Sequence, residues 1–233
     1  MNNFISNATK DLFTKKILLV SLLPLAIAAL ALGLLFWLFG GVLSGLVESL
    51  FLHIPYIGSW KWLQNSINAV GGVLLYSELL IIVSVMIVGI VADKVVIYIN
   101  DQHYHNAKKG FGTLAKSIIV SLKQNIIYII LLIFLFPLFF IPIIGLIVHL
   151  LLWYILIKKP LFFDSVALYA TKDEYKRLMK SDRLQTISLT LMSASLFFIP
   201  VIGVFIYVFQ LVVFAHYNLS RLLKIRESEK ALS

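Results

Sequence analysis

Two adjacent lysines near the start of the chain could bind an anion. Lys15 and Lys16 stand directly before Ile17–Phe39, a run that carries no charge. An anion that leaves water for lipid needs N–H donors and positive charge, and a helix N-terminus with basic side chains supplies both. The same residues also serve as the cytoplasmic anchor of an ordinary membrane span. The pair is therefore a predicted anion site, with a topology anchor as the alternative.

Glu78 and Arg183 are two further ionisable residues that a transport protein could use. Arg183 stands at the start of a later apolar block and is a weaker anion-binding candidate for the same reason as the lysines. Glu78 lies about a turn and a half inside the apolar segment that begins at Val73. An unpaired carboxylate is costly there, so the position predicts a role in proton coupling or gating. The alternative is that Glu78 reaches the outer headgroup region.

The other histidine and serine side chains form no motif that is typical of an enzyme. His149 and His216 lie in separate apolar blocks, where histidine can relay protons but more often serves packing. No His-x-x-x-His pair or carboxylate cluster predicts a metal site. Ser44, Ser193 and Ser195 lack the motif and partners of a catalytic nucleophile, and the chain has no cysteine. We therefore expect no catalytic residue, no metal and no cofactor.

Composition places these residues in an integral membrane protein. Of the 233 residues, 61% are hydrophobic and 13% are charged, and the mean hydropathy is +0.97. A soluble domain of this length does not carry such an apolar surplus. The net charge of +9 gathers in loops beside apolar segments, which is a topology signal and suits anionic lipid headgroups. It does not follow the pattern of a nucleic-acid-binding surface.

The charge pattern divides one membrane domain, 1–233, into segments. Two long apolar runs predict transmembrane helices, and the lysine-rich segments are expected in the cytoplasm. The predicted order is a cytoplasmic N-terminus 1–16, span 17–39, an outward amphipathic loop 40–72, long span 73–99, a cytoplasmic segment 100–123, hairpin 124–157, a charged cytoplasmic linker 158–183, hairpin 184–220 and a cytoplasmic tail 221–233.

Two nearly identical strings interrupt the apolar blocks in the second half of the chain. FFIPIIG occupies Phe139–Gly145 and FFIPVIG occupies Phe197–Gly203. Proline lacks an N–H and glycine tolerates a turn, so each string ends one helix and allows another to begin. Basic residues flank each block and predict cytoplasm-rooted, membrane-inserted hairpins, with two tilted full spans as the alternative. The predicted tip residues are Pro142, Gly145, Pro200 and Gly203.

Several local strings resemble one membrane-protein family. LFTKKILLVSLLPL at Leu12–Leu25 is similar to a basic pair that enters a helix with Leu-Pro-Leu, and VADKV at Val91–Val95 is similar to the end of a long second helix. FFIPVIG followed by an apolar run ending in Ala215–Tyr217 resembles a last hairpin. Together they resemble the CysZ-type sulfate permease family, which shares its fold with eukaryotic etoposide-induced membrane proteins.

The resemblance implies a function and a location. It implies an all-α oligomer in the bacterial inner membrane, with both termini cytoplasmic, that takes up sulfate for cysteine biosynthesis without ATP. The chain departs from the family at its lysine pair, which replaces arginines, at Ala26, which replaces an asparagine, and at a linker reduced to Phe162-Phe163-Asp164. Its expected partners are an inorganic anion, anionic lipids and further copies of the chain. The alternative is a membrane-shaping scaffold of the same fold without transport activity.

Overall fold

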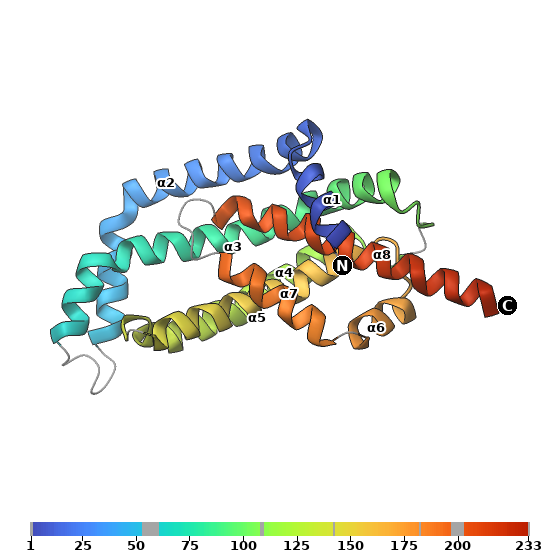
Figure 1. Ribbon diagram of the computed structural model, residues 1–233. Helices are drawn as coiled ribbons and strands as arrows, with labels where there is room; N and C mark the ends of the chain where they lie inside the picture. The colour runs from blue at the N-terminus through green and yellow to red at the C-terminus, as the bar shows by residue number, and fades with distance from the viewer. Residues whose placement is uncertain are drawn as a thin grey trace.

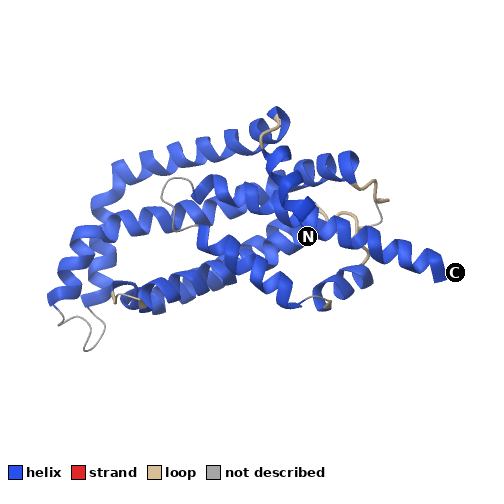
Figure 2. Cartoon of the chain, in the orientation of Figure 1, coloured by secondary structure: helices blue, strands red, loops and turns tan. Residues whose placement is uncertain are grey.

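The computed structural model describes residues 2–52, 61–107, 110–141, 143–181, 183–196 and 203–232. Helix accounts for 90% of the structure, and the described ranges contain no strand (Figure 2). The elements in Figure 1 are α1 (Asn2–Leu12), α2 (Lys15–Leu52), α3 (Lys61–His103), α4 (Leu114–Leu135), the 3-10 helix η1 (Phe136–Phe140), α5 (Ile144–Val166), α6 (Lys172–Lys180), α7 (Arg183–Ser195) and α8 (Gly203–Leu232).

The two longest helices, α2 and α3, contain the predicted spans 17–39 and 73–99 and extend beyond them. α2 has 38 residues and α3 has 43. At 1.5 Å per residue these are about 57 and 65 Å long, whereas a hydrocarbon core is about 30 Å thick. Tyr76 joins the pair, because its hydroxyl donates to the Ala29 carbonyl (3.3 Å) and its ring meets the Phe36 ring edge-on. The expected outer helical pieces of 40–72 are therefore continuous with α2 and α3 in the described residues.

Four helices in the described part are long and apolar enough to cross a membrane. They are Tyr76–His103, Leu114–Phe139, Ile144–Val166 and Ile206–Ala231. In α2 the described side chains give a shorter apolar helix, Ala26–Val42. Large apolar side chains also remain exposed on α4, which is unusual for a water-soluble helix. They include Ile119, Ile126, Ile130, Ile133 and Phe134. The chain is therefore a multi-pass membrane protein.

The chain reverses direction between α4 and α5, which pack along each other (Figure 1). Thr113 caps the start of α4, since its hydroxyl accepts the Lys116 N–H (3.3 Å). The turn places Ile143 at a φ of 68° and brings the Phe139 carbonyl against the next helix. A Cβ on Gly145 would lie 2.4 Å from that oxygen, so only glycine fits. Pro142 and Pro200 lie outside the described residues.

The linker predicted at 158–183 differs from the structure in its first half. α5 continues through Pro160 to Val166, and residues 160–170 are all buried. Lys158 does not end the helix, because its ammonium lies over the Tyr154 ring, 5.0 Å from the centroid. The second half is a short capped helix, α6, in which Thr171 and Glu174 form a capping box.

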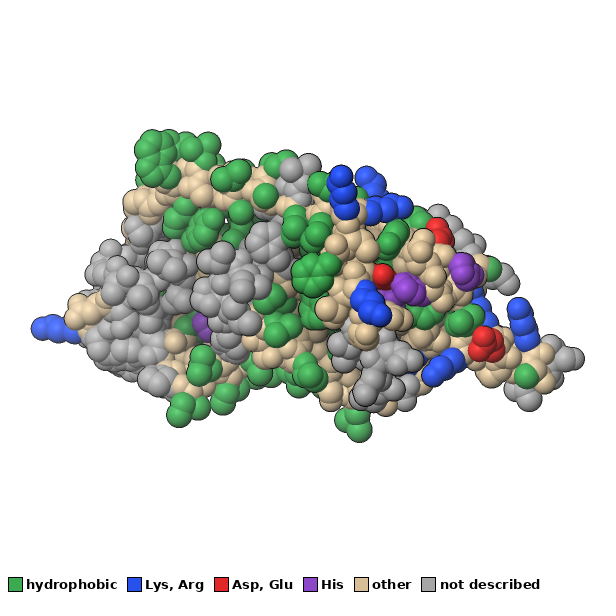
Figure 3. Space-filling view, turned by 45° about the horizontal axis from the view of Figure 1, so that its top comes forward, with side chains coloured by type: hydrophobic (Ala, Val, Ile, Leu, Met, Phe, Trp, Pro, Cys, Tyr) green, Lys and Arg blue, Asp and Glu red, His purple; other side chains and the backbone are tan. Residues whose placement is uncertain are grey.

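The core forms where α3, α5 and α8 pack together. Its largest fully buried side chains include Tyr128, Tyr207, Phe214 and Leu156. Figure 1 places the C-terminus and α6 toward one end of the molecule, with α1 nearby, and η1 with the connected ends of α2 and α3 at the other. Most of the Lys and Arg side chains visible in Figure 3 lie toward the end that holds the C-terminus, and many hydrophobic side chains are visible elsewhere on this face.

Candidate functional site

The predicted lysine pair lies at the start of α2. Lys15 is the first residue of this helix, and both lysine side chains are exposed. The first intrahelical hydrogen bond runs from the Leu18 N–H to the Thr14 carbonyl (3.0 Å). The N–H groups of Lys15 and Lys16 therefore have no partner inside the helix. The helix dipole adds partial positive charge at the same end.

A groove between α2 and α3 brings a second lysine to Lys16. The groove has a volume of about 220 Å³. The Lys16 ammonium lies 5.0 Å from the centroid of the Tyr98 ring, which holds it against α3. Lys94 precedes Tyr98 by one helical turn and lines the same space. The lining residues are Lys16, Ile17, Val20, Lys94, Val95, Ile97 and Tyr98.

Lys94 was not among the site residues predicted from the sequence, although it belongs to the VADKV string. The sequence shows that Lys94 lies one helical turn before Tyr98. It does not show that α2 packs against this part of α3. We name the pair of Lys16 and Lys94 with Tyr98 the lysine groove. Arg183 is the first residue of α7, and its side chain lies outside the described part of the structure. Its anion-binding role stays a prediction.

Glu78 lies inside the helical bundle and not at its surface. Only 1% of the residue is exposed. One carboxylate oxygen, Oε2, accepts a short hydrogen bond from the Tyr128 hydroxyl and a second from the Trp153 Nε1–H (3.3 Å). The other oxygen, Oε1, lies 3.0 Å from Nε2 of His149. Helix α3 thus supplies the carboxylate, and α4 and α5 supply its three partners.

His149 is held so that it shares one proton with Glu78. Its Nδ1 lies 3.2 Å from the Gly145 carbonyl, and a carbonyl can only accept, so Nδ1 carries a hydrogen. The ring also stacks on Phe139 with centroids 3.6 Å apart, and Trp153 lies beside it. Nε2 and the carboxylate then have a single proton between them, either as imidazolium with carboxylate or as two neutral groups. The sequence singled out both residues without connecting them.

A second buried carboxylate, Asp164, lies near the C-terminal end of α5. The Ser117 hydroxyl donates to its Oδ1 (2.5 Å), and Asp164 is 5% exposed. α3 approaches closely here, since a Cβ on Gly89 would lie 3.2 Å from the Ser117 hydroxyl. The sequence placed Asp164 in the cytoplasmic linker 158–183, and the structure buries it between α3, α4 and α5. Ionisable residues inside a membrane bundle mark functional positions more often than structural ones.

A third polar cluster holds α6 against α8. Arg226 donates from Nε to one oxygen of Glu174 (2.7 Å) and from Nη2 to the other (3.1 Å), and it also reaches the Tyr169 carbonyl (2.8 Å). Burial alone would raise the pKa of Glu174. The hydrogen bonds from Arg226 and from the Thr171 N–H outweigh burial and lower that pKa. This cluster stabilises the packing of α6 against the C-terminal part of α8.

The family described as Sulfate transporter CysZ/Etoposide-induced protein 2.4 matches residues 5–207 of the chain. No curated protein and no solved structure matches it. The matched residues include the lysine groove, Glu78 and His149, and they end near the start of α8.

Proposed function

We propose that this chain, which belongs to the Sulfate transporter CysZ/Etoposide-induced protein 2.4 family, is a permease of the bacterial inner membrane for a small inorganic anion. The proposed substrate is sulfate, taken up for cysteine biosynthesis. The observation that carries the proposal is the convergence of Lys16 and Lys94 on one groove at the start of α2. No nucleotide-binding motif occurs in the sequence, so the proposed driving force is an ion gradient.

The lysine groove suits capture of a dianion. Two ammonium groups from different helices supply charge, and the first turn of α2 supplies N–H donors. Lysine binds such an anion as a flexible point charge, without the two-pronged geometry of arginine. The contact between Lys16 and Tyr98 positions one ammonium in the groove. An arriving anion would replace this cation–π contact by a stronger charge–charge contact.

Glu78 and His149 are the proposed coupling or gating pair. Their single shared proton lies at a buried position between three apolar helices. A carboxylate there repels a passing dianion, and protonation removes that repulsion. We propose that uptake of the anion is coupled to a proton that this pair binds and releases. Asp164 is a second buried carboxylate that the anion would have to avoid.

The proposed topology has two membrane-inserted hairpins, α4 with α5 and α7 with α8, and both termini in the cytoplasm. The gathering of Lys and Arg toward the end with the C-terminus (Figure 3) supports this orientation. Exposed apolar side chains on α2 and α4 suit contact with lipid or with further copies. We propose an oligomer, because two hairpins from one chain do not enclose a pore.

Sulfate uptake into proteoliposomes tests the function. We expect saturable uptake by the wild type and a loss of at least about tenfold in Lys16→Ala/Lys94→Ala, because a hydrogen bond to a charged group is worth about 1.5–3 kcal/mol. Lys172→Ala is the matched control, since Lys172 is an exposed lysine at the start of α6. Wild-type uptake by the double variant would contradict the site. No uptake above empty liposomes by folded protein would favour the membrane-shaping scaffold.

A further inference from the structure

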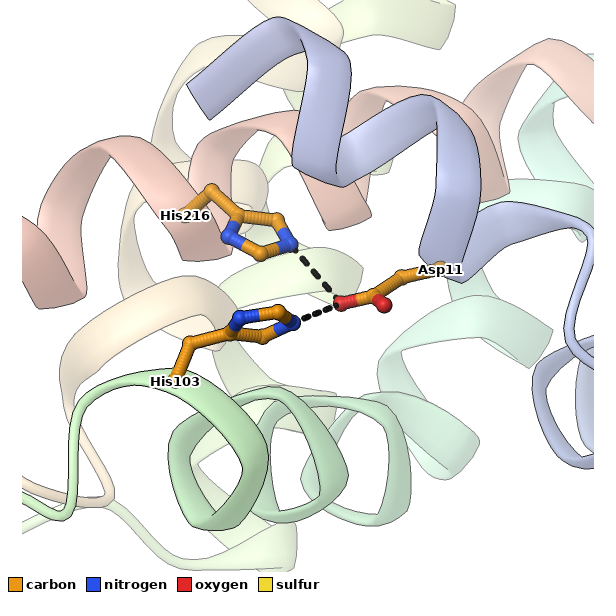
Figure 4. A group of neighbouring side chains, drawn as sticks. All are labelled: Asp11, His103 and His216. Carbon is orange, nitrogen blue, oxygen red and sulfur yellow. Dashed lines mark hydrogen bonds and ion pairs between the residues drawn. The ribbon is translucent and has the colours of Figure 1, made fainter. Parts of the chain in front are cut away.

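Three side chains from distant parts of the sequence meet away from the lysine groove and from Glu78 (Figure 4). They are Asp11 in the last turn of α1, His103 at the end of α3 and His216 in α8. Asp11 Oδ2 lies 2.8 Å from His103 Nε2 and 3.0 Å from His216 Nε2. One ligand atom from each residue lies within 4.8 Å of the others. No local sequence motif predicts this cluster, because each residue comes from a different helix.

The donor atoms match those of a divalent transition-metal site. Two imidazole nitrogens with one carboxylate oxygen are ligands that zinc and related ions prefer. Bonds of 2.0–2.2 Å in a tetrahedral site place neighbouring ligand atoms about 3.3 Å apart. The observed separations to Asp11 Oδ2 are only a few tenths of an ångström shorter. Small shifts of the three side chains would therefore admit an ion between them.

A fourth residue supports His216 as a metal ligand. The Tyr104 hydroxyl lies 2.8 Å from Nδ1 of His216. A metal on Nε2 leaves the proton on Nδ1, which then donates to the Tyr104 oxygen, and such outer partners are usual for metal-bound histidine.

The cluster is buried except on the side of His103. His216 is wholly buried and Asp11 is 7% exposed, whereas the His103 side chain is 29% exposed. An ion could enter beside His103, and a water molecule could complete the coordination there. The three ligands would tie α1 to α3 and α8, so the ion would fix the helix that precedes the lysine groove.

We propose that Asp11, His103 and His216 bind one divalent transition-metal ion of the zinc type, with Tyr104 as the outer partner of His216. The ion clamps α1 onto the ends of α3 and α8. This site is independent of the proposed transport function, because none of its residues lines the lysine groove or contacts Glu78. The competing account is a metal-free triad in which both histidines donate to the carboxylate.

Zinc binding to the full chain tests the site. The protein is purified in detergent with any histidine tag removed, stripped with a chelator and titrated with Zn²⁺ by calorimetry. We expect one ion per chain, and at least about hundredfold weaker binding in His103→Ala and in Asp11→Asn, since loss of an outer partner alone costs 10–100-fold. Tyr104→Phe, which keeps the ring, should weaken binding about tenfold.

His105→Asn is the matched control. His105 is an exposed histidine near the cluster, at a φ of 51° that asparagine tolerates. This variant should bind zinc as the wild type does. A chelator should lower the melting temperature of the wild type and of His105→Asn but not of His103→Ala. Equal zinc affinity in the wild type, Asp11→Asn and His103→Ala, or no binding by any of them, would overturn the site and establish the metal-free triad.

Discussion

Glu78→Gln is a substitution that removes the shared proton of the buried pair and keeps its shape. The glutamine oxygen can still accept from Tyr128 and Trp153, and its amide can donate to Nε2 of His149. The Nδ1–H of His149 keeps its bond to Gly145. Every polar atom remains satisfied, but the carboxylate that could bind and release a proton beside His149 is gone.

Glu78→Gln and His149→Leu should change the free energy of unfolding by different amounts. Because all the hydrogen bonds survive, Glu78→Gln should change the free energy of unfolding by no more than about 1 kcal/mol. His149→Leu instead removes Nε2, the partner 3.0 Å from Glu78 Oε1, and leaves that buried carboxylate oxygen beside an apolar side chain. Removing one partner of a buried pair costs about 3–5 kcal/mol. For a chain of this length that loss is about 6–20 °C in melting temperature.

The assay combines thermal unfolding in detergent with sulfate uptake into proteoliposomes that carry a pH gradient. Wild-type uptake should rise when the outside is acidic. Glu78→Gln should keep its melting temperature and lose this response to the gradient. Asp173→Asn is the control, because Asp173 is an exposed carboxylate on α6 and should behave as the wild type.

Two results would refute the reasoning. A full response to the pH gradient in Glu78→Gln would exclude Glu78 from proton coupling. An unchanged melting temperature in His149→Leu would show that the pair does not form as the structure places it. A double variant, Glu78→Gln/His149→Leu, measures the coupling between the two side chains directly.

Three further predictions concern the fold. Gly145→Ala should lower the melting temperature of the detergent-solubilised protein by several degrees, because its Cβ would lie 2.4 Å from the Phe139 carbonyl oxygen; an unchanged melting temperature would contradict the turn. The hydrogen bonds of Arg226 lower the pKa of Glu174, so their stabilisation is present above the usual value of 4.5 and is lost as the pH falls below it. Melting curves of the wild type and Glu174→Gln should therefore converge in acid, and a constant difference would contradict the assignment. A cysteine at Asp173 in this cysteine-free chain should react with a membrane-impermeant thiol reagent only from the cytoplasmic side; periplasmic labelling would contradict the proposed topology.

Local sequence features were sufficient for the class of protein. Long uncharged runs predict helices in lipid, because a helix satisfies its own backbone there, and the all-helical membrane protein is confirmed. The family resemblance is likewise confirmed over residues 5–207. It rested on short strings, of which VADKV lies within α3.

Helix lengths were less predictable from the sequence. The pair Lys158–Lys159 looked like the end of an apolar block, but α5 continues to Val166, its residues from Pro160 onward are buried, and the Lys158 ammonium lies over the Tyr154 ring. Charge at the end of a run is therefore ambiguous, since a long side chain can carry its ammonium to a distant partner. Only the packed structure shows whether the next residues are buried.

The contacts that make up the candidate sites were decided by tertiary structure alone. Glu78 and His149 were each singled out from the sequence, yet nothing local says that α5 brings the imidazole to 3.0 Å from the carboxylate. Lys94 joins Lys16 only because α3 runs beside α2. The sequence determined which residues are costly to place in lipid, and helix packing determined which partner satisfies each one, because that partner comes from another helix.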